Sequence, residues 1–116
     1  MCLNTRRPVR DLPKIVTGYK VWSSIYDFSK SVSRPKALLG KTYKAEGEFV
    51  LRDDAGDIPY RVGFHVWKAL AAAKRWGRID GGPIYRVELS QLTAIGGQCG
   101  STVYVGRRMK LIRRVS

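Results

Sequence analysis

The chain has 116 residues, and its 22 Lys and Arg residues against 9 Asp and Glu residues give a formal net charge of +13 at pH 7. Hydrophobic residues make up 44% and charged residues 27%, which excludes a collagen-like, mucin-like or wholly disordered chain. The length fits one domain. So large a charge of one sign predicts a polyanionic partner: nucleic acid, a nucleoprotein, an acidic protein face or an anionic membrane.

Targeting signals are the next feature that the sequence allows us to test. No apolar run approaches the roughly 18 residues of a membrane-spanning helix, and the N-terminus has no hydrophobic signal core. We therefore expect a cytoplasmic protein without a membrane partner. In that compartment Cys2 and Cys99 are most simply free thiols.

The first half of the chain predicts a basic arm followed by short strands. Residues 1–13 contain two prolines and are expected to form the arm, which precedes a single domain over residues 14–116. Residues 14–28 have the β-branched and aromatic composition of a strand, with a bulge or bend at Gly18. A polar basic loop over residues 29–36 follows, and further strands are predicted over 37–45, 48–51 and 60–66, with a turn over 53–57.

The second half predicts one helix and a series of strands. Residues 67–76 are rich in alanine and lysine, place Val66, Leu70 and Ala73 on one face, and are followed by Gly77 as the residue after the helix. Strands are predicted over 84–89, 92–95, 101–105 and 109–115, with a glycine-rich loop over 96–100. Short, turn-rich connections favour an α+β fold: a twisted, partly closed antiparallel sheet of about six strands with one helix packed on it.

The charge is unevenly distributed, because five of the nine acids fall between Glu46 and Asp57. Alternation along the last strand predicts an outer face with Arg108, Lys110 and Arg114 and an inner face with Met109, Leu111 and Arg113. The alternative is an edge strand that lysine and arginine protect from aggregation. We expect the polyanion-binding residues to be Arg6, Arg7, Arg10, Arg34, Lys36, Lys41, Lys44, Arg107, Arg108, Lys110, Arg113 and Arg114.

The aromatic residues are candidates either for the core or for stacking on bases. In so small a domain most are expected in the core, with one or two exposed at most. The larger candidates are Trp22, Tyr26, Tyr43, Tyr60, Phe64, Trp67 and Trp76, and Tyr19 and Tyr104 are the two for which exposure is considered.

Catalytic and metal-binding patterns are weak. His65 is the single histidine, and without Cys-x-x-Cys spacing the two cysteines do not predict a zinc site. His65 is expected to hydrogen-bond locally, although a nucleophilic pair with Cys2 or Cys99 stays open as an alternative. The glycine-rich loop with Arg107 and Arg108 is a second alternative, since backbone N–H groups there would hold phosphate. We expect no cofactor and no metal.

Three short segments resemble a group of small uncharacterised proteins encoded by bacteriophages and prophages. They are the opening Met-Cys-Leu-Asn-Thr, the Leu-Gly-Lys-Thr-Tyr-Lys-Ala of residues 39–45, and the Gly-Phe-His-Val-Trp of residues 63–67 before an alanine-rich helix. The resemblance implies a phage setting, in which small proteins without catalytic motifs often inhibit host defence systems such as CRISPR. It transfers no catalytic residue.

Charge and resemblance together predict a non-enzymatic inhibitor of a host defence nucleoprotein, acting in the host cytoplasm through a positively charged surface. A nucleic-acid-binding accessory protein and a nucleotide-binding domain that sequesters an anionic signal are the alternatives. Partners are thus a host nucleoprotein or nucleic acid, and the protein is expected to be a monomer or a homodimer.

Overall fold

The computed structural model describes residues 5–6, 12–22, 38–45, 50–52, 59–61, 63–80, 82–98 and 100–115. Over these residues the protein is mostly antiparallel sheet with a single short helix, so the predicted α+β class is confirmed. The elements are β1 (Thr5–Arg6), β2 (Ile15–Val21), β3 (Thr42–Lys44), β4 (Val50–Arg52), β5 (Pro59–Arg61), β6 (Phe64–Trp67), α1 (Leu70–Asp80), β7 (Ile84–Gln98) and β8 (Ser101–Arg114).

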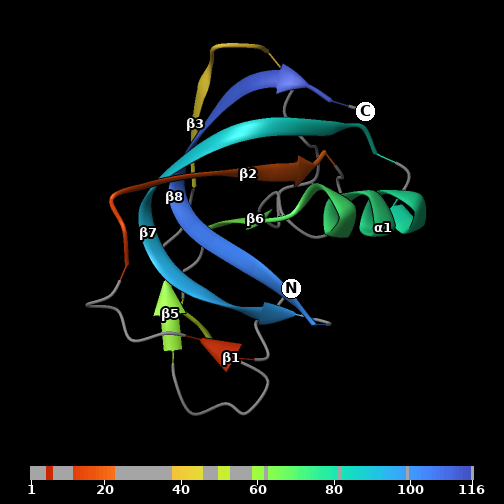
Figure 1. The fold of residues 1–116 in the computed structure, drawn as a ribbon. Helices are drawn as coiled ribbons and strands as arrows, with labels where there is room; N and C mark the ends of the chain where they lie inside the picture. The colour runs from red at the N-terminus through yellow and green to blue at the C-terminus, as the bar shows by residue number, and fades with distance from the viewer. Residues whose placement is uncertain are drawn as a thin grey trace.

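The main sheet has six strands in the order β1-β7-β2-β6-β8-β3, and β7 also pairs with β8. Strands β4 and β5 form a separate two-stranded sheet. In Figure 1, β7 and β8 run as two long curved strands, with α1 beside one end of the sheet and β1 and β5 towards the other. The β7–β8 pair therefore connects the two ends of the molecule.

The β7–β8 hairpin is longer than the sequence predicts. The sequence predicts breaks at residues 90–91, 96–100 and 106–108. In the structure residues 90–91 and 96–98 lie within β7, and residues 106–108 lie within β8. The ladder absorbs the irregular residues through register shifts between Arg86 and Val87 and between Leu92 and Ala94. Gly100 makes the turn with a φ of 79°, a left-handed conformation that glycine adopts without a steric penalty.

Other predicted boundaries also differ from the structure. Thr5 and Arg6 pair with Gly97 and Gly96, so part of the expected arm belongs to the sheet. The expected strand over residues 60–66 is divided into β5 and β6, with Gly63 outside both.

The helix begins at Leu70 rather than at residue 67, because Trp67 pairs with Val103 in β8. It continues through Gly77 to Asp80, so the prediction that Gly77 follows the helix is wrong. Val66 consequently lies in a strand, whereas Ala73 is buried on the helix as expected. At the N-terminal end of α1, strand pairing of Trp67 therefore overrides its helix propensity.

Close backbone contact explains two glycines of the sheet. A Cβ at Gly106 would lie 2.7 Å from Leu89 Cγ and 2.8 Å from the Ser90 carbonyl oxygen. A Cβ at Gly18 would lie 2.5 Å from Val66 Cγ1, and the β2–β7 register runs through Gly18 without a bulge. The bulge predicted at Gly18 is therefore wrong, and the glycine instead lets β2 approach β6.

The core consists of two clusters of buried residues, and strands of the main sheet contribute to both. The first packs α1 against the sheet around Val21, Trp67 and Ala73. The second contains Trp22, with Tyr43 and Tyr85 edge-on to its ring at centroid distances of 5.3 and 5.6 Å. The expectation that most aromatic residues lie in the core is confirmed for Trp22, Tyr43, Phe64 and Trp67, and Tyr19 and Tyr104 are half-buried. Tyr26 lies outside the described residues, as do the side chains of Tyr60 and Trp76.

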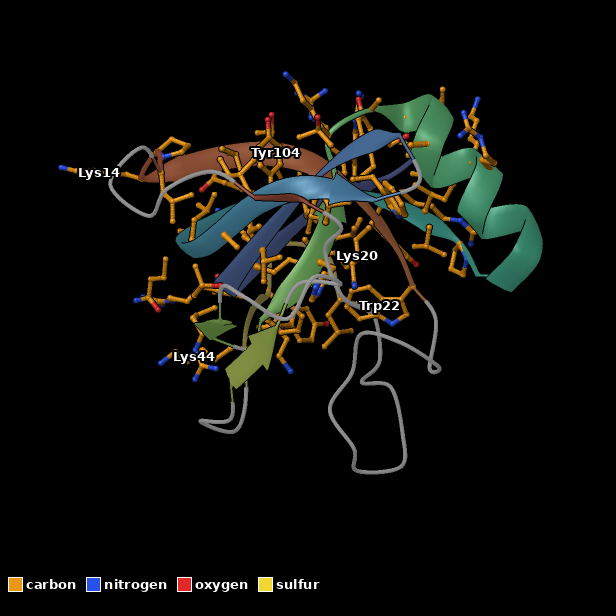
Figure 2. All side chains as sticks on the ribbon, turned by 90° about the horizontal axis from the view of Figure 1, so that it is seen from below. Lys14, Lys20, Trp22, Lys44 and Tyr104 are labelled. Carbon is orange, nitrogen blue, oxygen red and sulfur yellow. The ribbon has the colours of Figure 1, made fainter. Side chains whose placement is uncertain are left out.

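A buried lysine connects two strands that are otherwise barely paired. The β2–β6 ladder has one residue pair, Tyr19 with Trp67, so the sheet is not clearly closed. Lys20 is fully buried (0% exposed), and its Nζ donates a hydrogen bond to the carbonyl oxygen of His65 in β6 at 3.1 Å. Figure 2 shows Lys20 close to Trp22 on one side of the sheet. The sequence analysis did not identify this residue, because one lysine among 22 cations carries no distinguishing signal.

Gly106→Ala is expected to lower the free energy of unfolding by about 1–3 kcal/mol, because the new methyl group overlaps a backbone oxygen and a buried leucine. Gly100→Asn is the matched control in the same hairpin: its Cβ meets nothing within 4 Å, and Asn tolerates a left-handed φ. Urea denaturation measures both. Equal losses for the two variants would contradict the close-contact explanation.

Lys20→Met is expected to destabilise the protein by about 1–3 kcal/mol, because it removes the donor to the buried His65 carbonyl while keeping an apolar side chain of similar length. Lys74→Met, at an exposed position of α1, should change stability by less than about 0.5 kcal/mol. A Lys20→Met protein as stable as the wild type would show that the lysine is not a link between β2 and β6.

Candidate nucleic-acid interface

Strand register brings cations from three strands onto the face of the sheet opposite Met109 and Leu111. Directly paired residues point to the same face of an antiparallel sheet. One row across the strands is Lys44, Arg108, Ser90 and Ile15; the next is Thr42, Lys110, Glu88 and Thr17. The row between them, Tyr43, Met109, Leu89 and Val16, contributes to the second core cluster. The same strands thus carry apolar residues inside and cations outside.

A bulge adds Arg113 to this outer face. Val87 pairs with Leu111 and Arg86 pairs with Arg113, so Ile112 is the extra residue on β8. Simple alternation predicts Arg113 on the inner face with Met109 and Leu111; that prediction is wrong, because the extra residue returns Arg113 to the side of Lys110. Met109 and Leu111 are fully buried, as predicted. We call the resulting set the cationic face: Lys44, Arg86, Arg108, Lys110 and Arg113.

Two pairs within the cationic face set like charges directly opposite each other. Lys44 is paired with Arg108, and Arg86 with Arg113. Such pairs are destabilising by roughly 0.2–1 kcal/mol relative to neutral ones. Glu88, opposite Lys110, is the acid at these register positions. Lys44, Lys110 and Arg113 are exposed, and Arg86 and Arg108 are half-buried.

Other predicted binding residues lie elsewhere. Lys41 places its Nζ 5.0 Å from the centre of the Tyr43 ring, which is on the inner side of β3, so it is separated from Lys44. Arg107 and Arg114 alternate along β8 with the cationic face, and Arg114 is paired with Tyr85. The backbone of Arg6 lies in β1, opposite Gly96. Four predicted residues lie outside the described part of the chain: Arg7, Arg10, Arg34 and Lys36.

The sequence analysis missed Arg86 and Lys14. Arg86 shares its parity with Glu88 and Ser90 in β7, so alternation alone assigns it to their face. Its association with the β8 cations required the register, which no sequence pattern gives. Lys14 is exposed immediately before β2, and Figure 2 shows it and Lys44 at the side of the molecule away from α1.

A cavity of about 520 Å³ adjoins the cationic face where β7 bends. Its lining is Leu12, Pro13, Lys14, Ser90, Gln91, Leu92 and Arg108. Gln91 has a φ of 52°, in the left-handed region that non-glycine residues rarely adopt. A register shift follows directly, between Leu92 and Ala94. The cavity therefore combines two cations, a hydroxyl, an amide and an apolar wall at a strained bend.

The catalytic and phosphate-loop alternatives find less support. His65 is buried, and its Nδ1 lies 3.3 Å from the Gly63 carbonyl oxygen, which confirms the expected local hydrogen bond. Cys2 and Cys99 lie outside the described residues. Gly96 and Gly97 are strand residues paired with both β1 and β8, so the loop predicted over residues 96–100 does not include these two glycines. Within the described ranges, no cluster of three or more His, Cys, Asp or Glu residues could hold a metal ion.

Comparison with known protein families, curated proteins and solved structures finds no match for this chain. None of the helical segments in the described ranges is long and apolar enough to cross a membrane. The cationic face and its cavity are therefore the features of the described residues that bear on function.

Arg113→Gln is expected to raise the free energy of unfolding at low salt by about 0.2–1 kcal/mol, because it removes the like-charge pair with Arg86. The gain should shrink as added salt screens the repulsion. Lys68→Gln, at an exposed position before α1, removes the same charge elsewhere and serves as the control. Denaturation at several salt concentrations measures the effect. A destabilised Arg113→Gln protein, or a gain independent of salt, would contradict the repulsion between these arginines.

Proposed function

We propose that the protein binds nucleic acid through the cationic face. The observation that carries this proposal is the pairing of like charges across β3, β8 and β7, with Lys44 opposite Arg108 and Arg86 opposite Arg113. Folding brings these side chains together against their mutual repulsion. A polyanion that neutralises them recovers that free energy on binding, so the arrangement favours a phosphate-rich ligand.

The chemistry of the side chains also suits phosphate. Arginine forms two parallel N–H bonds to a phosphate, and lysine acts as a point charge beside it. Arg108 and Lys110 are two residues apart on one strand face, so their Cα atoms are separated by about 7 Å. Contacts of this kind hold the backbone of a nucleic acid without reading its sequence. The face would thus bind strands of any sequence.

The same surface is consistent with inhibition of a nucleoprotein, the role that the phage resemblance implies. A domain that covers nucleic-acid phosphates, or occupies them within a larger complex, would block access without chemistry of its own. We further propose that the sheet is partly closed through β2 and β6, which would put the cationic face on the outer, convex side of a curved sheet. The hydrogen bond from Lys20 to His65 supports this closure.

The decisive variant is Lys44→Glu with Lys110→Glu, tested by fluorescence anisotropy with a labelled single-stranded oligonucleotide. We expect affinity to fall at least about tenfold, and the slope of log K against log salt to fall by about 1.4 if each lysine contacts one phosphate of the single strand. The matched control is Lys68→Glu with Lys74→Glu, which has the same net charge but changes exposed lysines at and beside α1. Its affinity should stay within about threefold of the wild type.

Two outcomes would oppose the proposal. Equal losses in the two double variants would mean that net charge, rather than the cationic face, drives binding. Binding that does not depend on salt would indicate apolar contacts instead of phosphate contacts. Circular dichroism of each variant confirms that the comparison is made between folded proteins.

A further inference from the structure

We propose that the cavity beside β7 holds one unpaired nucleobase of a strand whose phosphates lie on the cationic face. This inference rests on the proposed function and adds a base-binding site to it. Arg108 belongs both to the cavity lining and to the cationic face, so a strand on that face passes the mouth of the cavity. The occupant is therefore expected to be a nucleotide unit rather than a separate small molecule.

The lining matches the two parts of a nucleotide. Leu12, Pro13 and Leu92 offer apolar surface to the face of a base, and Lys14 and Arg108 offer cations to its phosphate. The cavity volume of about 520 Å³ is largely open to solvent, so a base held there would be covered on one side. Exposed aromatic side chains, the usual stacking surface for single strands, are not part of this lining, so aliphatic packing replaces stacking here.

Gln91 supplies hydrogen bonds to the edge of the base. A glutamine amide carries both donors and an acceptor, so it can form two hydrogen bonds to a base edge that presents an acceptor beside a donor. Adenine (N6–H and N7) and thymine (N3–H and O4) both present such an edge, so the amide favours a base over an abasic sugar without choosing between these two. Gln91 is exposed at the cavity, so its amide is available to a ligand.

The backbone at Gln91 is a second, independent observation. A left-handed φ costs a non-glycine residue free energy that glycine would not incur, and such conformations concentrate at binding sites. A glycine would fit this bend without strain, which makes the glutamine side chain the feature that distinguishes the position. A hydrogen bond from the Gln91 amide to a base would explain why this position keeps a strained glutamine.

The test compares three labelled strands of equal length: oligodeoxyadenylate, oligothymidylate and an abasic sugar-phosphate strand. The wild type should bind both base-containing strands about tenfold more tightly than the abasic one. Gln91→Ala should remove most of that preference while changing affinity for the abasic strand less than about twofold. Thr102→Ala, exposed on β8 outside the cavity, should keep the wild-type order.

Gln91→Gly separates a folding defect from a binding defect. It relieves the left-handed strain, so its melting temperature should equal or exceed that of the wild type, and it should lose the preference for base-containing strands as Gln91→Ala does. Equal wild-type affinity for the adenine and abasic strands would overturn the base site, as would retention of the preference in both Gln91 variants.

Failure of the base site and failure of the proposed function give different results. If all three strands bind equally and with strong salt dependence, the cationic face stands and the base site is rejected. If no strand binds, the proposed function is rejected, and AMP and ribose 5-phosphate are titrated into ¹⁵N-labelled protein. Shifts of the Ser90–Leu92 amides with AMP alone would then support a base-binding cavity, and no shift would overturn it.

Discussion

The structure depends on the register of β8 with its neighbours. This strand pairs with β7, β6 and β3, and each pairing assigns every second residue to the core and every other one to solvent. A shift by one residue would bury Lys110 and expose Met109 and Leu111. Because that exchange is so unfavourable, the apolar side of the ladder fixes the position of the cations on the other side. The cationic face is therefore a consequence of core packing.

Close contact at glycine permits the curvature that this arrangement requires. Gly106 lies against Leu89 and the Ser90 carbonyl, at the point where β7 bends beside the cavity. A Cβ at this position would overlap both groups, so a side chain here requires a local shift of β7 against β8. On the other side of the sheet, Gly18 brings β2 onto β6, where Lys20 adds the hydrogen bond to His65 that the short ladder does not provide.

Composition and alternation predicted the α+β class, the aromatic core and the outward direction of Arg108 and Lys110, because these depend on local period and side-chain volume. The sequence could not predict which strands are neighbours. It therefore missed Arg86, whose link to Arg113 depends on a bulge at Ile112, and it placed Arg113 on the wrong face. It also divided β7 and β8 at glycines and polar residues that a long ladder accommodates. Lys20 was missed because burial of a charged side chain contradicts every composition rule.

Stability and binding oppose each other on the cationic face. Replacing Arg113 or Lys44 by a neutral residue relieves repulsion in the free protein and would remove a phosphate contact in the complex that we propose. The strained Gln91 shows the same opposition one strand away, where glycine would relax the backbone and remove the amide. Two unrelated unfavourable features thus lie at the cavity: the like-charge pair of Lys44 with Arg108, and the left-handed backbone of Gln91. A fold under selection for stability alone would retain neither, so their coincidence is an argument that this corner of the sheet binds a ligand.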